Sequence, residues 1–313
     1  MAAVALHKRL VISLAAVAAA SALLVLPIGS EAGVPAVSGL SVTDVTPSSF
    51  TVVWLSSEPS APSISMFMAD CATPVYGAFT SARSGDSTGN LRVTVSNLSP
   101  NTLYCYQTVT TSKSTSESAL LPAAPATVTT EKAAYQMTTT AGVTTPFANS
   151  LLAVPPVYQK DANASTDGVA VTLTVLDNKA SHPLSTLTSG GSGAAYFNLN
   201  NLYDPATGYS LNLTGGERVM LAESHGLDGC AVEHFYKLVP DAEKIDVQTP
   251  VTCALMQDLD CSGEVNILDV LREVKWNATA RGGACFNGDS DMNGDGSVDQ
   301  TDVFNVSGSF GMK

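Results

Sequence analysis

The stretch DMNGDGSVDQTD, residues 291–302, carries acidic and amide side chains at regular intervals. Calcium takes about six to eight oxygen ligands, and a twelve-residue loop can supply them from positions 1, 3, 5, 7, 9 and 12, with glycine at position 6. Counting from Asp291 places an oxygen donor at every one of these positions and Gly296 at position 6. The expected ligands, with position 7 contributing its backbone carbonyl, are Asp291, Asn293, Asp295, Ser297, Asp299 and Asp302.

A second copy of the pattern, DLDCSGEVNILD, occupies residues 258–269 and has Gly263 at position 6. Its expected ligands are Asp258, Asp260, Ser262, Glu264, Asn266 and Asp269. Two copies in one register predict two calcium ions as the cofactors of the chain. Because Ser262 is neutral where the other loop has Asp295, and because ligand charge tunes affinity, the first site is expected to be the weaker one.

Helical patterns follow both loops and precede neither. Pro250 and several β-formers stand before the first loop and a glycine-rich stretch before the second, which argues against entry helices. After the first loop an apolar stripe predicts an exit helix, part of whose stripe should be core and part contact surface: Ile267, Val270, Leu271 and Val274. QTDVFNVSGSF predicts a second exit helix that Gly308 weakens, and Val298 at position 8 should pair the two loops through a short β-contact.

This duplicated loop and exit helix, with aspartate at position 12, resembles a dockerin domain over about residues 251–313. The resemblance implies a small α-helical, calcium-binding domain that docks onto a cohesin-type domain of another protein, usually within polysaccharide-degrading assemblies. It also implies partner contact through loop positions 10 and 11, which are Ile267, Leu268, Gln300 and Thr301. Since the two halves differ at these positions, interchangeable binding through either half is not expected. Cys261 and Cys285 depart from the family pattern.

The N-terminus has the features of a secretory signal peptide. His7, Lys8 and Arg9 precede an apolar run that ends near Ile28, and small residues follow at cleavage-site spacing, so residues 1–32 are expected to be removed. The alternative is a retained membrane anchor. No later segment is apolar enough to span a bilayer. The sequence therefore predicts a secreted, extracellular protein, with association with the cell surface left open.

Composition narrows the partners. The formal net charge of −13 disfavours nucleic acid and anionic membranes as partners and suits a cation-binding secreted protein. Six cysteines in an oxidising compartment predict disulfides, and nearest-neighbour pairing gives Cys71–Cys105, Cys230–Cys253 and Cys261–Cys285.

Residues 33–132 alternate short β-runs with Pro and Gly, the pattern of an antiparallel sandwich. FTVVWL places Phe50, Val52 and Trp54 on one face of a strand. The segment Leu98-x-Pro100-x-Thr102-x-Tyr104 resembles the E–F corner of fibronectin type III domains, with Tyr104 as the corner tyrosine. Alternation then turns Tyr104 and Tyr106 inward and Cys105 outward. Adjacency of strands C and F in that family makes a Cys71–Cys105 bridge reasonable.

Residues 133–249 contain further strand patterns and predict a second β-sandwich-like domain, and residues 250–313 form the dockerin-like domain. The expected fold class is thus mainly β and multidomain, with two sandwiches followed by a small helical calcium-binding domain.

The chain lacks the common catalytic motifs, which predicts a non-catalytic protein. One polar cluster offers ligands for a transition metal if its cysteine is reduced, although a disulfide staple is the favoured interpretation: Glu223, His225, Asp228, Cys230, Glu233 and His234. The predicted function is calcium-dependent docking onto a cohesin-like partner. The alternatives are a carbohydrate-active hydrolase with its site in residues 133–249, since two carboxylates suffice for that chemistry, and a calcium-stabilised surface adhesin.

Overall fold

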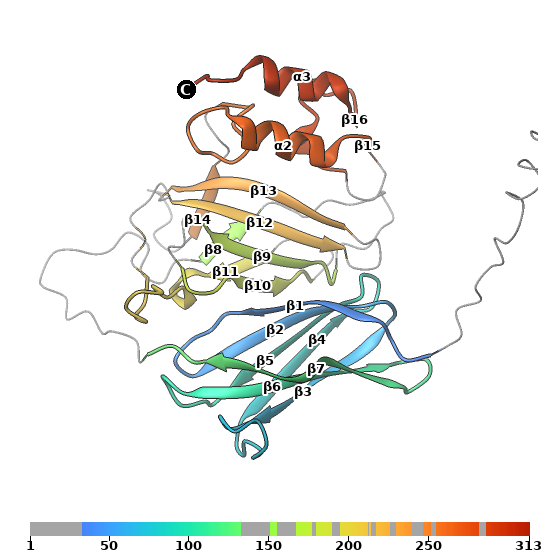
Figure 1. Cartoon of the computed structure of the whole chain (residues 1–313), viewed down its shortest axis with the longest axis vertical. Helices are drawn as coiled ribbons and strands as arrows, with labels where there is room; N and C mark the ends of the chain where they lie inside the picture. Colours follow the sequence, from blue (N-terminus) through green and yellow to red (C-terminus); the bar gives the residue numbers. More distant parts are fainter. Residues whose placement is uncertain are drawn as a thin grey trace, which may run out of the picture. The chain divides into compact units, whose positions relative to one another are not determined.

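Figure 1 shows the chain as a computed structural model. The structure describes residues 33–132, 151–154, 167–176, 180–189, 195–211, 213, 217–225, 230–239, 247–251, 255–281 and 286–313. Residues 1–32, Cys253 and Cys285 lie outside the described residues, so the signal peptide and two of the disulfide pairings stay predictions. From Val34 onward the chain forms one compact unit. None of the described helices is long and apolar enough to cross a membrane.

The first domain is a β-sandwich of seven antiparallel strands. They are β1 (Val37–Thr43), β2 (Ser49–Ser56), β3 (Ser60–Phe67), β4 (Phe79–Gly85), β5 (Asn90–Ser96), β6 (Leu103–Ser112) and β7 (Ser118–Thr129). One sheet has the order β1-β2-β5-β4 and the other the order β3-β6-β7. The expected sandwich is therefore present.

Strand β2 shows why this sequence closes a sandwich. Phe50, Val52 and Trp54 are fully buried in the core between the two sheets, as their alternation predicts. Trp54 donates its indole N–H to the hydroxyl of Thr110 at 2.7 Å, which satisfies the one polar atom that its burial removes from water. Val53, on the opposite face, packs in a separate buried cluster outside this core.

The predicted corner is also present. The backbone N–H of Ser99 donates to the hydroxyl of Tyr104 at 3.0 Å, and both Tyr104 and Tyr106 lie in the core. Cys105 lies on the other face of β6 and forms the predicted disulfide with Cys71, with their Cα atoms 5.1 Å apart. Cys105 is nevertheless completely buried, so its outward direction does not bring it to solvent.

The second domain contains one seven-stranded sheet of order β10-β9-β12-β13-β14-β8-β11. Its strands are β8 (Leu151–Val154), β9 (Ala170–Val175), β10 (Leu184–Leu187), β11 (Ala195–Asn198), β12 (Arg218–His225), β13 (Cys230–Val239) and β14 (Val247–Val251), with a 3₁₀ turn, η1 (Leu199–Asn201). Phe197 of β11 and Leu184 of β10, at opposite ends of the strand order, lie in one core cluster. The sheet therefore curls around its core and encloses it as two layers of a sandwich would.

The first sandwich and the second sheet are joined by hydrogen bonds between buried and half-buried polar groups. Asn90 donates from Nδ2 to the backbone oxygens of Gly168 at 3.0 Å and Ser224 at 2.7 Å. Asp44 accepts hydrogen bonds from the backbone N–H and the hydroxyl of Ser185, and it forms an ion pair with Arg92 at 3.3 Å. Burial, the largest influence, raises the pKa of Asp44, although Arg92 opposes it. These bonds satisfy Nδ2 of Asn90 and the carboxylate of Asp44, whereas the buried Oδ1 of Asn90 has no hydrogen-bond partner among the described residues.

The C-terminal module consists of two loop–helix halves. Its elements are α2 (Ile267–Trp276), β15 (Thr279–Ala280), η3 (Gly288–Ser290), β16 (Ser297–Val298) and α3 (Gln300–Gly308). Both α-helices stand where the exit helices are expected. Each begins with a capping box, Asn266 with Asp269 and Asp299 with Asp302, which satisfies orphan N–H groups of the first turn. Among the described residues no α-helix leads into either loop.

Candidate metal centre

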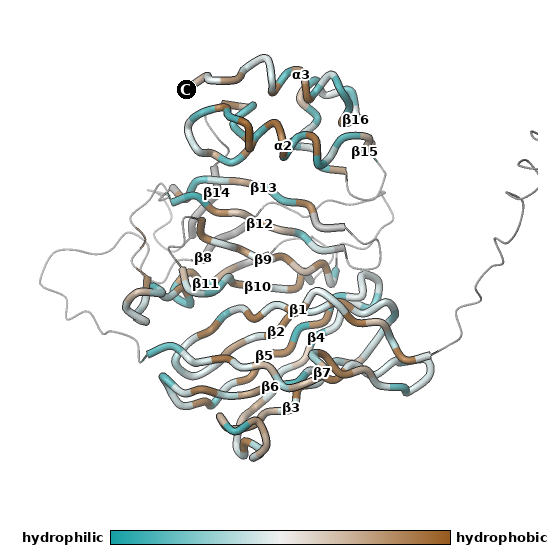
Figure 2. Tube along the Cα trace, in the orientation of Figure 1, coloured by the Kyte–Doolittle hydropathy of each residue, from teal (hydrophilic) through white to brown (hydrophobic). Residues whose placement is uncertain are grey.

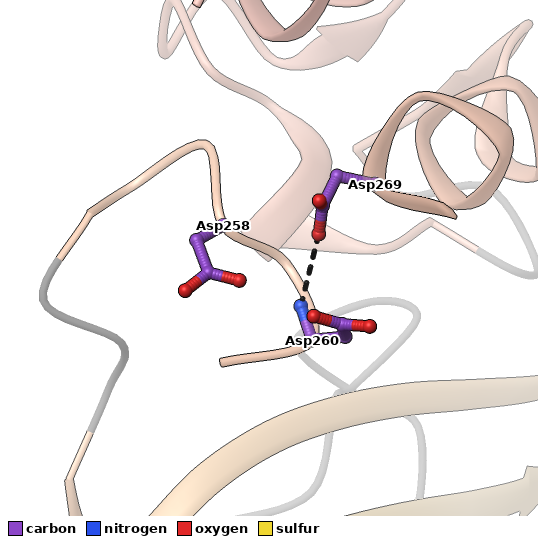
Figure 3. A group of neighbouring side chains, drawn as sticks. All are labelled: Asp258, Asp260 and Asp269. Atoms are coloured by element: carbon purple, nitrogen blue, oxygen red, sulfur yellow. Dashed lines mark hydrogen bonds between the residues drawn. The ribbon is translucent and has the colours of Figure 1, made fainter. Parts of the chain in front are cut away.

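Loop 1, residues 258–269, brings three buried carboxylates together (Figure 3). One oxygen each of Asp258, Asp260 and Asp269 lie within 4.8 Å of one another. Oδ1 of Asp269, at the start of α2, accepts the backbone N–H of Asp260 at 3.2 Å, the dashed line in Figure 3. Asp258 accepts the backbone N–H of Gly263 at 2.8 Å. Three negative side chains held this close form an environment that favours a cation.

Loop 2, residues 291–302, repeats this hydrogen-bond frame position by position. Oδ2 of Asp291 accepts the N–H of Gly296 at 2.9 Å, matching positions 1 and 6 of loop 1. Oδ1 of Asp302 accepts the N–H of Asn293 at 3.2 Å, matching positions 12 and 3. The bonds between positions 1 and 6 and between positions 12 and 3 therefore recur in both loops.

Backbone conformation follows the same register. Gly263 and Gly296 at position 6 have φ of 93° and 90°, a conformation that side chains with a Cβ rarely adopt. At position 4, Cys261 and Gly294 have φ of 55° and 73°. The glycine at position 6 is thus required by the turn in each loop.

Two observations test whether these residues suit a cation. Oδ1 of Asp291 is buried and has no hydrogen-bond partner, and Asp291 is 7% exposed. An unpaired buried carboxylate oxygen is costly unless a cation or another partner neutralises it. In loop 1, burial first, and then the negative charges of Asp260 and Asp258, raise the pKa of Asp269. The oxygen-only donor set suits calcium.

The remaining predicted ligands lie on the solvent side of the loops. Ser262 and Asn266 of loop 1 are hydrogen-bonded to each other at 3.4 Å, and both also bond to the backbone oxygen of Glu264. In loop 2, Asn293 donates to Asp295 at 2.9 Å. Ser297 is half-buried and Asp299 is exposed. The ligands expected at positions 1 and 12 are therefore buried in both loops, whereas those at positions 5, 7 and 9 are exposed or half-buried.

The predicted pairing of the two loops through position 8 is wrong. Val298 pairs with Thr279, after α2, and its carbonyl accepts the N–H of Ala278 at 2.8 Å. Val265, the position-8 residue of loop 1, pairs with the C-terminal tail: its N–H donates to the carbonyl of Met312 at 2.9 Å. Each loop thus bonds to the extended residues after the other half's helix, because that backbone has unused donors and acceptors. The two halves interlock.

The expectation that part of the α2 stripe is core is also wrong. None of the four stripe residues is buried. The exposed fractions are 56% for Ile267, 57% for Leu271 and 50% for Val274, and Val270 is half-buried. The buried face of α2 instead carries Asp269, Glu273 and Trp276. Position 12 must face its loop, and residues four and seven positions later share its face. Most of the exposed residues of α2 are therefore apolar. Figure 2 shows the hydrophobic segments of α2 in brown along its trace.

Of the predicted partner-binding residues, Ile267 and Leu268 begin α2, and Leu268 is 51% exposed. Gln300 and Thr301 begin α3 and are exposed. In addition, the structure reveals Phe304 of α3 as 70% exposed, which the sequence did not single out. All four predicted positions are accessible to a partner.

Glu273 is a buried acid that sequence reasoning missed. It is fully buried on α2, and neither carboxylate oxygen has a hydrogen-bond partner in good geometry, although the Ser290 hydroxyl is near enough to moderate its pKa. Burial, with added repulsion from Asp302 and Asp291, raises the pKa of Glu273 to about 7. Its spacing of four from Asp269 was the available signal.

The C-terminal module packs on the β12–β13 side of the second sheet. Val232 of β13 lies in one buried cluster with Trp276, Phe286 and Val298. Lys275 forms an ion pair with Glu233 at 2.9 Å. A cavity of about 400 Å³ remains in this contact, lined by residues that include Phe235, Leu255, Met256, Arg272 and Trp276.

The polar cluster proposed for a transition metal is divided by the structure. His234 lies between Glu223, at 3.7 Å, and Asp289, at 2.7 Å. Glu233 pairs instead with Lys275. Asp228 and the side chains of His225 and Cys230 lie outside the described residues. The part that is described is a histidine flanked by two carboxylates.

The cysteines of the C-terminal module are partly described. Cys261 is disulfide-bonded, and the described residues contain no free cysteine. Its predicted partner, Cys285, lies outside the described residues, as does Cys253. Cys261–Cys285 and Cys230–Cys253 therefore stay predictions.

Comparison with known proteins adds little. No family model matches the chain, and no curated protein matches it. An interface mutant of a type II cohesin–X-dockerin complex from Acetivibrio cellulolyticus aligns at 14% identity and a TM-score of 0.20, covering 52% of this chain and 96% of that chain. The FN1–FN3 domains of chicken CNTN1 align at 10% identity and 0.20, covering 70% and 67%. A marsupial T cell receptor aligns at 12% and 0.22, covering 68% and 98%.

Proposed function

We propose that this chain is a secreted, non-catalytic, modular protein whose C-terminal module binds two calcium ions and docks onto a cohesin-type domain of another protein. Two β-domains would carry the docking module within an extracellular assembly that degrades polysaccharides. The formal net charge of −13 disfavours nucleic acid and anionic lipid as partners.

The calcium proposal rests on the surroundings of Oδ1 of Asp291. This carboxylate oxygen is buried and has no hydrogen-bond partner. Asp291 stands at position 1 of loop 2, and its hydrogen bond from the glycine at position 6 recurs in loop 1. Bound calcium would supply the positive charge that offsets the repulsion between the carboxylates of each loop. The residues themselves fix the loop geometry through backbone hydrogen bonds to positions 1 and 12.

The observation that supports docking is the outward apolar face of α2. Ile267, Leu268, Leu271 and Val274 are each half exposed or more on a helix of ten residues. Neighbouring apolar side chains on one helix are costly in water unless a partner covers them. Asp269 at position 12 fixes the rotation of α2, so an ordered loop 1 would hold this face in place for a partner.

Calorimetric titration of the full chain with calcium tests the metal function. Two binding events are expected, and Asp291→Ala should remove the tighter one. Asp86→Ala, which removes a surface carboxylate paired with Lys113 in the first sandwich, is the matched control and should leave both events unchanged. A wild-type chain that binds one ion or none would contradict the paired sites.

Docking is tested with the immobilised full chain and the secreted proteins of its source, in calcium and in chelator. The expected result is capture of a protein with a cohesin-type domain that chelator releases, followed by direct binding of that purified domain. Capture that chelator leaves untouched would favour the calcium-stabilised adhesin. Hydrolysis of polysaccharides by the purified chain would favour the hydrolase.

A further inference from the structure

Two arginines from outside loop 1 contact Asp260, its position-3 residue. Arg272 of α2 donates from Nη1 to Oδ2 of Asp260 at 3.0 Å. Arg218 of β12, in the second sheet, donates from Nη1 to the backbone oxygen of Asp260 at 3.3 Å and lies 3.9 Å from Oδ1. The side chain of Asp260 is only 6% exposed. Both of its carboxylate oxygens therefore lie close to a guanidinium charge with little water between them.

Loop 2 has no such contact among the residues that the structure describes. Its position 3 is Asn293, which is exposed and donates to Asp295. No ion pair joins a described lysine or arginine to a carboxylate of loop 2, whereas loop 1 also receives Lys313 on Glu264 at 3.1 Å. The hydrogen bonds between positions 1 and 6 and between positions 12 and 3 recur in both loops, so the arginines add a difference in charge to the one between Ser262 and Asp295.

We propose that Arg218 and Arg272 lower the calcium affinity of loop 1, so that the second sheet, through Arg218, contributes to the strength of a site in the C-terminal module. The inference rests on the proposed calcium function. A guanidinium beside a ligand carboxylate neutralises part of its charge and repels a divalent cation in the same loop. The Arg218 and Arg272 side chains are 24% and 29% exposed, which limits screening by salt.

The coupling works in both directions. Arginine stays charged at every accessible pH, so the repulsion is permanent. Arg218 lowers the affinity of loop 1 for a cation by some factor. By linkage, a cation bound in loop 1 weakens the contact between Arg218 and Asp260 by the same factor. The calcium affinity of loop 1 therefore depends on the contact between the C-terminal module and β12. This contact involves a residue outside the twelve residues of the loop.

The test is calorimetric calcium titration of the full chain carrying Arg218→Met or Arg272→Met, which keep an unbranched apolar stem. The weaker site should tighten about threefold in the Arg218 variant, the size expected for a partly exposed charge pair. It should tighten about tenfold in the Arg272 variant, whose hydrogen bond to the carboxylate is shorter. The tighter site should change less than about twofold in both, because loop 2 lacks the contact.

Lys275→Met is the matched control. It removes one positive charge from the same contact with β13, but its partner is Glu233 rather than a loop carboxylate. Both calcium affinities should stay as in the wild type. Thermal unfolding in chelator confirms that each variant is folded before it is titrated.

The outcomes separate this inference from the proposed function. Two sites in the wild type with an unchanged or weakened first site in both arginine variants would overturn the inference alone. Equal tightening in the Lys275 variant would also overturn it, since net charge would then explain the effect. A wild-type chain that binds no calcium would overturn the calcium function together with this inference.

Discussion

His234 on β13 and Asp289 on η3 are joined by a 2.7 Å contact between Nδ1 and Oδ2. This contact links the second sheet to the turn that leads into loop 2. Burial alone lowers the pKa of His234, but the hydrogen bond and charge of Asp289, with the charge of Glu223, outweigh it, so the pKa is raised. The folded protein therefore holds the proton of His234 more tightly than the unfolded chain does.

The raised pKa predicts a pH-dependent stability. Protonated His234 stabilises the fold fully below its unfolded pKa of about 6.5, and this contribution is lost as pH rises through the folded pKa. In chelator, His234→Gln should lower the free energy of unfolding by about 1–2 kcal/mol at pH 6 and by clearly less at pH 9. Urea unfolding followed by tryptophan fluorescence measures it.

His182→Gln is the control for this prediction. Burial, opposed by Glu131, lowers the pKa of His182, so its native contribution should grow as pH rises towards 6.5. Above about pH 6.5 the effect of the His182 substitution should therefore stay constant, while the effect of the His234 substitution declines. A His234 effect that stays constant from pH 6 to pH 9 would contradict the raised pKa.

Replacing Glu273 with glutamine is expected to stabilise the folded protein. Its pKa of about 7 lies above its usual value, so the cost of ionising it is absent below about pH 4.5 and complete above about pH 7. In chelator, Glu273→Gln should raise the free energy of unfolding by about 2–3 kcal/mol at pH 8 and hardly change it at pH 4.5. Equal effects at both pH values would show that packing, rather than charge, limits this position.

The exposed ends of the helices predict unequal contributions to docking. Leu268→Ala should weaken binding of the cohesin-type partner by about 2 kcal/mol, because it truncates an apolar anchor. Thr301→Ala should weaken it less, and neither should change calcium binding. Surface plasmon resonance with the purified partner gives both values. Loss of binding in the Thr301 variant alone would assign the contact to α3.

Tyr104→Phe tests how much the corner hydrogen bond stabilises the first sandwich. The phenol oxygen accepts the N–H of Ser99, and its removal leaves that donor without its partner. The free energy of unfolding should fall by about 1–2 kcal/mol, with the disulfide between Cys71 and Cys105 retained. Thr102→Ala, which removes a hydroxyl bonded only to the nearby Pro100 carbonyl, is the control and should cost less. Equal losses would leave the corner without special weight.

Local patterns predicted much of this structure because the responsible forces act over a few residues. Alternation in FTVVWL placed Trp54 in the core, and the spacing of donors placed Asp258 and Asp291 at equivalent points of two loops. The Cys71–Cys105 bridge followed from strand adjacency. The side-chain period of a strand explains the burial of Trp54, whereas the bridge was expected from the resemblance to fibronectin type III domains.

The rotation of α2 was predicted wrongly because two rules conflicted. The apolar stripe through Leu271 suggested one inward face, whereas Asp269 required another, and the loop prevailed because its carboxylate accepts two backbone N–H groups. The contact of Arg218 with Asp260 could not be predicted, since the residues are 42 positions apart and meet only when one domain packs on another. Likewise, the pairing of Val265 with the C-terminal tail depends on tertiary structure.

Strand β14 gives the C-terminal module its mechanical anchor. It lies inside the sheet, antiparallel to β13 on one side and parallel to β8 on the other, and it ends at Val251, just before the module begins. A pulling force directed along this strand would load its hydrogen bonds to β13 and β8 in shear. An edge strand would instead peel away one bond at a time. The chain is therefore joined to its C-terminal module at a point that resists extension.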